Sequence, residues 1–415
     1  MNIPKRLKKG QAQFLENPNL RQVFDLIETA GGQIRVNGGA VRNALLGEPV
    51  EEVDLSTDLL PEQVSKLGEA CGLQVVPTGI EHGTVTVISG HQPYEITTLR
   101  EDIETDGRWA TVQFGTDWKA DAMRRDFTIN ALYCDRNGNL YDPLVGFADL
   151  AARTVRFIGD PDQRIAEDKL RILRFFRFFA WYGSDRPDPE SLKACVRNRD
   201  GLQGLSAERI WREFKKLMSA PDPVRSLLWM RTTKILSSIA PETENWGIDL
   251  LPSLVAIRQQ MDEPIDPLLR LMAIIPPRLD RVDELSARLK LSNDETARLK
   301  NWAGLPELAA AMTENELAKI MYRANSRAAQ DALWLQMAKQ ASKEEETSET
   351  HKLVNYAKSW VRPELPVQGR DLINLGLPAG PEIGKVLAQL EQAWIDSNFS
   401  LNKAELIELA GESSD

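Results

Sequence analysis

The strongest constraint on the fold is a change in the hydrophobic pattern near Leu150. Before it, short segments of alternating β-branched and polar residues are separated by glycine-containing turns, a pattern typical of strands. After it, apolar residues recur at the three- and four-residue spacing of amphipathic helices. We therefore predict an α+β protein, in which a small mixed β-sheet with helices forms an N-terminal head and the remainder is all-α.

The helical remainder is long enough to divide further. A charged run from Ala341 to Lys352 is interpreted as a solvated loop or linker. We expect four parts: a head over residues 1–150, a neck over 151–225, a body over 226–350 and a tail over 351–415.

Composition excludes several classes of protein. No apolar run approaches the roughly 18 residues that cross a bilayer, so we expect no membrane span. The basic N-terminus is followed by a polar amphipathic segment, unlike a signal peptide. The three cysteines, Cys71, Cys134 and Cys195, are widely spaced, which predicts a cytoplasmic location and argues against structural zinc. The net charge of −10 argues against indiscriminate coating of nucleic acid but not against a local basic groove.

A strand–turn–helix segment, VNGGAVRNALLG, is the first candidate for ligand binding. Gly38 and Gly39 allow the backbone to approach a ligand closely, and the following helix presents free N–H groups to an anion. Arg42 lies in the first helical turn, where it can bind a phosphate oxygen. An ordinary strand–turn–helix connection has the same pattern, so the interpretation depends on the carboxylates that follow.

Those carboxylates begin in the segment EEVDLSTD. Glu52 and Asp54 occupy alternate positions of a predicted short strand, so their side chains would share one face. Glu95 could join them from a neighbouring strand. Carboxylates beside a phosphate-binding turn are what two-metal phosphoryl transfer requires, whereas each one alone would be interpreted as solvated surface charge.

The segment MRRDFTINALY places Arg124, Arg125, Asp126 and Asn130 around an apolar strand. Two adjacent arginines can be a solvated edge. Beside the groups above, Arg125 is a candidate contact for a triphosphate or ribose.

The segment EDKLRILRFFR is the fourth candidate. Asp168 and Arg171 are three residues apart and would share a helix face, which Arg174 and Arg177 continue. A carboxylate and a guanidinium side by side can pair with the polar edge of a base and select C and A over U and G. Intrahelical ion pairs, for instance between Glu167 and Arg171, are the alternative.

These segments resemble the class II tRNA nucleotidyltransferases, or CCA-adding enzymes, and their relatives the bacterial poly(A) polymerases. The resemblance spans roughly the first 220 residues, and the segment LPVQGRDLINLGLPAGPEIGKVL is similar to the family's tRNA-binding tail. The five matching motifs, in the family's order, are GGAVR (Gly38–Arg42), EVD (Glu52–Asp54), RRDFTINA (Arg124–Ala131), EDKLR (Glu167–Arg171) and SAER (Ser206–Arg209).

The resemblance implies a polymerase-β-like catalytic head, a neck that reads the base and a tail that binds tRNA. The reaction would add C, C and A to tRNA 3′ ends from CTP and ATP without a template, releasing pyrophosphate. The segment from Arg100 to Asp126 is similar to the family's flexible-loop region, which favours full CCA addition over a CC-only enzyme.

The resemblance also implies a role for each matched position. Asp54, with Glu52 in the position of the first aspartate, would hold Mg²⁺, with Mn²⁺ as an alternative. Glu95 stays a third catalytic candidate, suggested by its place on a neighbouring strand. Asp168 and Arg171 would read the base, with Arg174 and Arg177 behind them. The remaining nucleotide-binding positions would be Gly38, Gly39, Arg42, Arg125, Asp126 and Asn130.

Two residues depart from the family pattern. Asn43 stands where the family often has aspartate after the arginine, which we interpret as a minor change. Glu52 replaces the first aspartate of the metal-binding pair. Its extra rotatable bond makes one geometry more costly in side-chain entropy, so we expect a competent site with weaker or altered metal preference.

Two other functions stay open in the sequence. A poly(A) polymerase would share the catalytic head, but such enzymes tend to end in basic segments, whereas this sequence ends ELIELAGESSD. Glu52 also motivates a catalytically weakened RNA-binding relative. For tRNA binding, we expect a local positive face formed by Arg209, Arg212, Lys215 and Lys216. This face would recognise mainly the backbone and the shape of the tRNA. The pattern does not indicate an oligomeric state.

Overall fold

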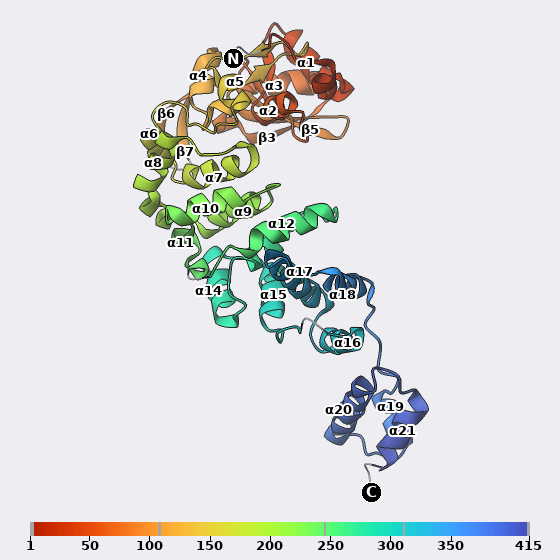
Figure 1. Ribbon diagram of the computed structural model, residues 1–415. Coiled ribbons are helices and arrows are strands. Elements are labelled where there is room, and N and C mark those ends of the chain that lie inside the picture. Colours follow the sequence, from red (N-terminus) through yellow and green to blue (C-terminus); the bar gives the residue numbers. More distant parts are fainter. Residues whose placement is uncertain (1–3, 107–108, 245, 310–311, 413–415) are drawn as a thin grey trace. The chain divides into compact units, whose positions relative to one another are not determined.

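The computed structural model describes residues 4–106, 109–244, 246–309 and 312–412. It consists of two compact units, Met1–Ile239 and Ala240–Asp415 (Figure 1). The first contains a mixed sheet and the second is helical, so the predicted α+β class is confirmed. No helix in the described part of the chain is long and apolar enough to cross a membrane.

The head sheet has seven strands in the order β3-β4-β5-β2-β1-β8-β9. Its pairs are antiparallel except that β2 runs parallel to β5. The strands are β1 (Ile34–Asn37), β2 (Leu55–Thr57), β3 (Gln74–Gly79), β4 (Thr84–Ser89), β5 (Gln92–Thr98), β8 (Tyr133–Cys134) and β9 (Leu140–Tyr141). A separate hairpin pairs β6 (Arg100–Asp106) with β7 (Trp109–Phe114).

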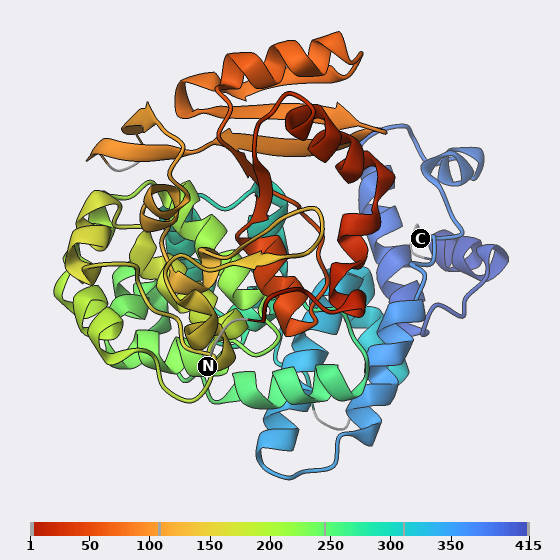
Figure 2. The same cartoon turned by 90° about the horizontal axis from the view of Figure 1, so that it is seen from above.

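Helices cover the sheet and continue into the neck. Figure 2 shows α3 lying along the outer strands, where it contacts β3 and β4. The helices of the head are η1 (Lys9–Glu16), α1 (Pro18–Glu28), α2 (Gly39–Leu46), α3 (Pro61–Ala70), η2 (Ile80–His82), α4 (Trp118–Met123), η3 (Thr128–Asn130) and α5 (Gly146–Ala151). Those that follow in this unit are α6 (Pro161–Glu167), α7 (Arg171–Tyr182), α8 (Pro189–Arg197), η4 (Arg199–Gly204), α9 (Ala207–Met218), α10 (Val224–Thr232) and α11 (Ile235–Ile239).

The second unit is built from helices. They are η5 (Pro241–Thr243), α12 (Leu250–Gln260), α13 (Pro267–Met272), α14 (Leu279–Leu289), α15 (Asn293–Ala303), α16 (Glu314–Arg323), α17 (Ser326–Ser342), α18 (Ser348–Ser359), α19 (Gly369–Asn374), α20 (Pro381–Asp396) and α21 (Lys403–Glu412). An apolar cluster around Trp394 joins the last three of these helices to Tyr322 of α16.

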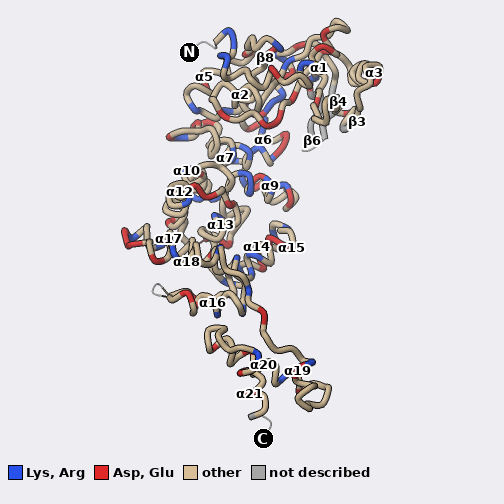
Figure 3. Tube along the Cα trace, turned by 90° about the vertical axis from the view of Figure 1, so that its right-hand side faces the viewer, with Lys and Arg blue, Asp and Glu red and all other residues tan. Residues whose placement is uncertain are grey.

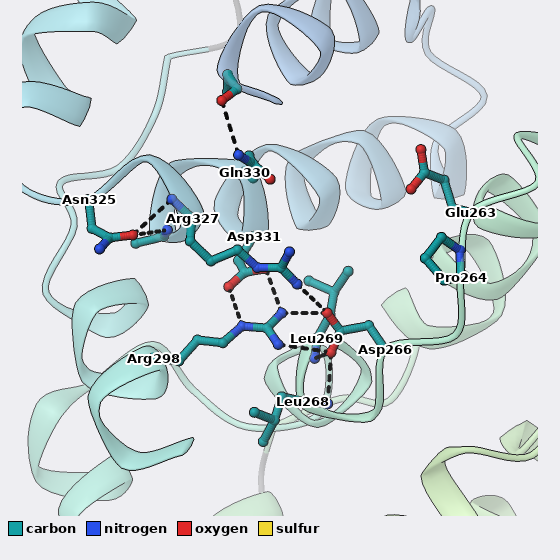
Figure 4. A network of polar contacts seen from close by, with 12 residues as sticks. Glu263, Pro264, Asp266, Leu268, Leu269, Arg298, Asn325, Arg327, Gln330 and Asp331 are labelled. Atoms are coloured by element: carbon teal, nitrogen blue, oxygen red, sulfur yellow. Dashed lines mark hydrogen bonds and ion pairs between the residues drawn. The ribbon is translucent and has the colours of Figure 1, made fainter. Parts of the chain in front are cut away.

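A polar network around the buried Asp331 ties α13, α15 and α17 together (Figure 4). Arg298 pairs with Asp266 at 2.6 Å and with Asp331 at 2.8 Å, and Arg327 also pairs with Asp266. Asp266 accepts two backbone N–H groups at the start of α13 as well. The network neutralises Asp331, whose side chain is only 1% exposed, so its charge is not left unpaired in the core.

Three expectations about secondary structure are corrected. The strand expected to include Glu52 and Asp54 begins only at Leu55. The strand expected within MRRDFTINALY is a 3₁₀ turn, η3, followed by the two-residue strand β8. The charged run interpreted as a linker is largely helical, because only residues 343–347 separate α17 from α18. Most of the flexible-loop match forms β6, β7 and α4, but residues 107 and 108 lie outside the described residues.

Candidate active site

A glycine turn between β1 and α2 is enclosed by two guanidinium groups. Gly38 has φ +62° and ψ −120°, a conformation that side-chain-bearing residues rarely adopt. A Cβ atom on Gly38 would lie 3.3 Å from Nη1 of Arg125, and one on Gly39 would lie 3.5 Å from Nη2 of Arg42. The two glycines therefore bring backbone N–H groups and two cations together, an arrangement suited to binding an anion.

The guanidinium of Arg125 is held by four side chains. Its Nε donates to the hydroxyl of Tyr133 at 3.1 Å, its Nη1 to Oδ1 of Asn37 at 3.0 Å, and its Nη2 to Oδ2 of Asp121 at 3.1 Å. A longer contact of 3.4 Å joins Nη2 to the hydroxyl of Ser56. The expected nucleotide contact is thus firmly oriented by the protein itself.

Asp121 is a residue of this site that the sequence reasoning missed. It is fully buried in α4 and also accepts a hydrogen bond from Nε of Arg124 at 2.8 Å. Burial by itself would raise the pKa of Asp121, but the charges of Arg125 and Arg124 and the hydrogen bond from Tyr133 bring this pKa below its usual value. The signal was available, because Asp121 precedes the two arginines by three and four residues.

Arg42 is similarly enclosed and is only 7% exposed. Its guanidinium donates to Oδ1 of Asn130 at 2.5 Å, to Oδ1 of Asn43 at 2.9 Å and to the hydroxyl of Tyr182 at 2.7 Å, and it lies 3.9 Å from the centre of the Tyr182 ring. The Asn43 amide also donates to the carbonyl of Pro49 at 3.0 Å. Asn43 therefore orients Arg42 as a neutral acceptor, and Tyr182 of α7 is a second residue that sequence reasoning missed.

Asp126 connects the head to α7. Nε of Arg174 donates to its Oδ2 at 2.9 Å, and Nδ2 of Asn130 donates to its Oδ1 at 3.0 Å. Burial opposes ionisation of Asp126, yet Arg174 and Asn130 lower its pKa to about 2. Because Asn130 also contacts Arg42, the structure brings Arg42, Asn130, Asp126 and Arg174 into one continuous chain of polar contacts.

The prediction that Asp168 and Arg171 share one helix face is wrong. Helix α6 ends at Glu167 and α7 begins at Arg171, while Asp168 has an extended backbone with φ −151° and ψ 109°. Arg171 forms an ion pair with Glu167, the pairing considered as the alternative, and Oδ2 of Asp168 accepts a hydrogen bond from Arg209 at 2.7 Å. The two residues are neighbours at a helix junction and do not pair with each other.

Helix α9 lies against α7 and supplies partners to this part of the site. Besides the Arg209–Asp168 pair, Nε of Arg177 lies 2.7 Å from Oε2 of the buried Glu213. The basic residues of α7 and α9 can be followed in Figure 3. Of the four residues expected to form a positive face, Arg212 and Lys216 are exposed, Lys215 is half-buried and Arg209 is engaged with Asp168.

The predicted metal-binding carboxylates lie just before β2 and on β5. Leu55 of β2 is in register with Ile96 of β5, which makes Asp54 and Glu95 neighbours across the two parallel strands. Although Asp54 is exposed, partial desolvation raises its pKa, and the negative charges of Glu95 and Glu52 raise it further, while Arg125 partly offsets them. The structure thus places Asp54 within electrostatic range of both Glu95 and Glu52.

These carboxylates also line a cavity of about 1580 Å³. In the described parts of the chain, neither an ion pair nor a side-chain hydrogen bond engages Glu52, Asp54 or Glu95, and no three Asp, Glu, His or Cys side chains converge tightly enough to hold a metal ion by themselves. Mg²⁺ is commonly bound by one or two carboxylates together with substrate phosphates and water, so this oxygen donor set fits such an ion.

Three family models match successive parts of the chain. They are the poly A polymerase head domain over residues 34–156, the probable RNA and SrmB-binding site of polymerase A over residues 186–246, and the tRNA nucleotidyltransferase domain 2 over residues 275–410. They cover most of each of the two compact units.

Similar proteins extend along nearly the whole chain. The mitochondrial CCA tRNA nucleotidyltransferase 1 of Mus musculus is 33% identical over 97% of this chain and 92% of its own length. The CCA-adding enzyme of Streptococcus gordonii is 31% identical over 91% and 92%. The crystal structure of the Bacillus stearothermophilus CCA-adding enzyme in complex with CTP matches with a TM-score of 0.74 and 25% identity, covering 98% of each chain.

Proposed function

Because the chain belongs to the family of CCA-adding enzymes, or tRNA nucleotidyltransferases, we propose that it adds C, C and A in turn to tRNA 3′ ends. The substrates are CTP, ATP and tRNA, and the reaction needs no nucleic-acid template. The matched relatives, which cover more than nine-tenths of the chain, are CCA-adding enzymes, and this favours CCA addition over the poly(A) polymerase alternative.

One observation carries the proposal. A set of carboxylates without partners among the described residues, Glu52, Asp54 and Glu95, lies close to a glycine turn that is flanked by Arg42 and Arg125. Nucleotidyl transfer needs this combination, because the triphosphate must be bound by cations and N–H groups while its α-phosphorus stays close to the metal-binding carboxylates.

Both the family and the carboxylate oxygens of this site support the binding of a divalent cation. We propose that Asp54 and Glu52 hold Mg²⁺, with Mn²⁺ as an alternative. When bound, such an ion lowers the pKa of the attacking hydroxyl and neutralises charge on the leaving pyrophosphate. Glu95 adds negative charge next to Asp54 and strengthens the attraction for a cation.

The nucleotide would be bound by this chain's own residues. Gly38, Gly39, Arg42 and Arg125 are proposed to contact the triphosphate and ribose. Asp126 and Asn130 hold Arg42 and Arg174 in place through the contacts described above. Asp168 and Arg171 would pair with the edge of the base, supported by Arg174 and Arg177.

The remaining predictions complete the proposal. The head (1–150) is proposed to be catalytic, the neck (151–225) to recognise the base, and the tail (351–415), which follows the helical body (226–350), to bind tRNA. Arg212 and Lys216, with Arg209 and Lys215 beside them, are proposed to contact RNA. A cytoplasmic location stays a prediction.

The test is nucleotide addition to a tRNA transcript that lacks its 3′ CCA. With CTP, ATP and Mg²⁺, the products should be extended by one, two and three nucleotides and stop there. A long ladder of A on unrelated RNA would instead support a poly(A) polymerase, and no incorporation with either Mg²⁺ or Mn²⁺ would support the weakened RNA-binding relative. In the same assay, Asp54→Ala should lose nucleotide incorporation, because it removes a proposed ligand of the ion. The matched control is Glu51→Ala, which changes an adjacent exposed carboxylate with no proposed role and should keep incorporation.

A further inference from the structure

We propose that Asp121 is a positioning residue for nucleotide binding, which acts by fixing the guanidinium of Arg125 beside the glycine turn. The inference rests on the proposed function, because it assigns Arg125 to the nucleotide. Asp121 itself is fully buried and would not touch the substrate.

The two oxygens of Asp121 have separate partners. Oδ1 accepts from Arg124, whereas Oδ2 accepts from Nη2 of Arg125 at 3.1 Å and from the hydroxyl of Tyr133 at 2.7 Å. The Tyr133 hydroxyl in turn accepts from Nε of Arg125 at 3.1 Å. Asp121, Tyr133 and Arg125 therefore form a closed triangle of hydrogen bonds, which leaves the guanidinium plane little freedom to rotate.

The triangle determines which donor of Arg125 remains for a ligand. A guanidinium has five N–H donors. The N–H of Nε donates to Tyr133, and one N–H of Nη1 donates to Asn37. The two N–H groups of Nη2 donate to Asp121 and Ser56. In the part of the chain that the structure describes, the second donor on Nη1 has no partner, and Nη1 is the atom that lies closest to the Cβ position of Gly38. The donor that remains is thus at the glycine turn.

The position of Asp121 is set by two elements. It lies in α4, whose first turn is capped by the side chain of Asp117, which accepts from the N–H of Lys119 at 2.7 Å. Trp118 of the same helix packs edge-on against Tyr133 of β8, with ring centroids 5.4 Å apart. Helix and strand therefore hold the acceptor for Arg125 from two sides, and removing its charge would leave a largely buried guanidinium without its anionic partner.

The test is a double-mutant cycle on the full-length protein, with KM for CTP, ATP and tRNA measured separately. Asp121→Asn should raise KM for both nucleotides by roughly tenfold and leave KM for tRNA within about twofold, because one charge-assisted contact to the nucleotide ligand is misplaced. In an Arg125→Lys background, the same substitution should change KM for the nucleotides by less than about twofold, since the group it positions is already gone.

Asp149→Asn is the matched control. Asp149 accepts from the hydroxyl of Thr128, in the same motif as Arg125, at 2.7 Å, but it has no contact with Arg125. This variant should keep all three KM values. If Asp121→Asn does not fold, Tyr133→Phe removes the hydroxyl of the triangle, and a rise in nucleotide KM of roughly threefold is expected.

Three results would overturn the role of Asp121: unchanged nucleotide KM, equal effects in both backgrounds, or a parallel rise in KM for tRNA. The first two would show that Asp121 does not act through Arg125, and the third would show a general loss of structure. A wild-type protein that adds no nucleotide would overturn the proposed function instead, so the two failures are distinguishable.

Discussion

Two sets of carboxylates in the first unit differ in whether an arginine pairs with them. The paired set, Asp121, Asp126, Asp168 and Glu213, has an arginine partner for each member. The open set, Glu52, Asp54 and Glu95, has no ion-pair partner among the described residues.

The difference has an electrostatic consequence. In the paired set, the arginines lower the pKa of Asp121 and Asp126 despite burial. In the open set, whose members are exposed, partial desolvation and like charges raise the pKa of Asp54. The protein thus pairs the carboxylates that orient its arginines with those arginines and leaves the open set without an ion-pair partner at the place where we propose that a divalent cation binds.

The largest effect is expected at the centre of the open set. Asp54→Asn should reduce nucleotide incorporation by roughly 10³-fold, because loss of a metal ligand removes several kcal/mol of transition-state stabilisation. The same variant should be slightly more stable than the wild type at neutral pH in the absence of metal, and the gain should be small because Asp54 is exposed and solvent screens its charge. A raised pKa means that ionised Asp54 favours the unfolded state as pH rises through that pKa, and asparagine removes this penalty.

Incorporation rates and the unfolding free energy in urea with EDTA would check both parts. Glu51→Gln is the control, with activity and stability near those of the wild type. An Asp54→Asn variant that is less stable than the wild type would show that Asp54 has a stabilising partner, which would break the distinction between the two sets.

The second prediction concerns the paired set and pH. The pKa of Asp126 is about 2 in the folded protein, against an ordinary value of 3.8. A lowered pKa contributes stability above the ordinary value, and this contribution is lost as pH falls from about 4 toward 2. The contribution is about 2 kcal/mol. Asp126→Asn should therefore flatten the dependence of the unfolding free energy on pH in this range.

Urea unfolding of wild type and Asp126→Asn between pH 2 and pH 5 measures this difference. Glu190, an exposed carboxylate in an ion pair with Lys193, offers a matched control, since Glu190→Gln should leave the slope almost unchanged. Equal slopes for wild type and Asp126→Asn would contradict the assignment of Asp126 to the paired set.

The smallest effect is expected from Glu52→Asp. Aspartate has one fewer rotatable bond, so holding it in one geometry should cost less side-chain entropy, and the Mg²⁺ concentration for half-maximal activity should fall by roughly two- to threefold. Titration of activity with Mg²⁺ and with Mn²⁺ measures this shift, and Glu51→Asp is the control. No change in either titration would argue that Glu52 is not a ligand of the ion.

Local pattern predicted much of the fold and part of the site. The alternating and helical periodicities gave the α+β class, because they reflect which face of each element is buried. The turn at Gly38 was identified because its φ of +62° is one that glycine adopts readily and other residues rarely adopt. The helix predicted through Asp168 failed for a physical reason. Oδ1 of Asp168 accepts from the N–H of Leu170 at 3.0 Å, and such a local side-chain contact competes with helical hydrogen bonds.

The strand at Glu52 and Asp54 failed for another reason. Pairing of β2 with β1 and β5 begins only at Leu55, so the alternation of side chains expected of a strand does not extend to the two acidic residues. Asp54 nevertheless lies next to Glu95, because the parallel register that pairs Leu55 with Ile96 places the residue before each of them side by side. No spacing in the sequence encodes that register.

The sequence by itself determined which chemical groups are present and where local turns occur: glycines for a tight turn, carboxylates for a cation, and arginines for phosphate. Only the tertiary structure decided which carboxylate each arginine pairs with. Arg174 reaches Asp126 across 48 residues of sequence and Arg209 reaches Asp168 across 41. These choices depend on distance and burial in the folded protein, because the Coulomb interaction follows separation in space and the local dielectric, whatever the position along the chain.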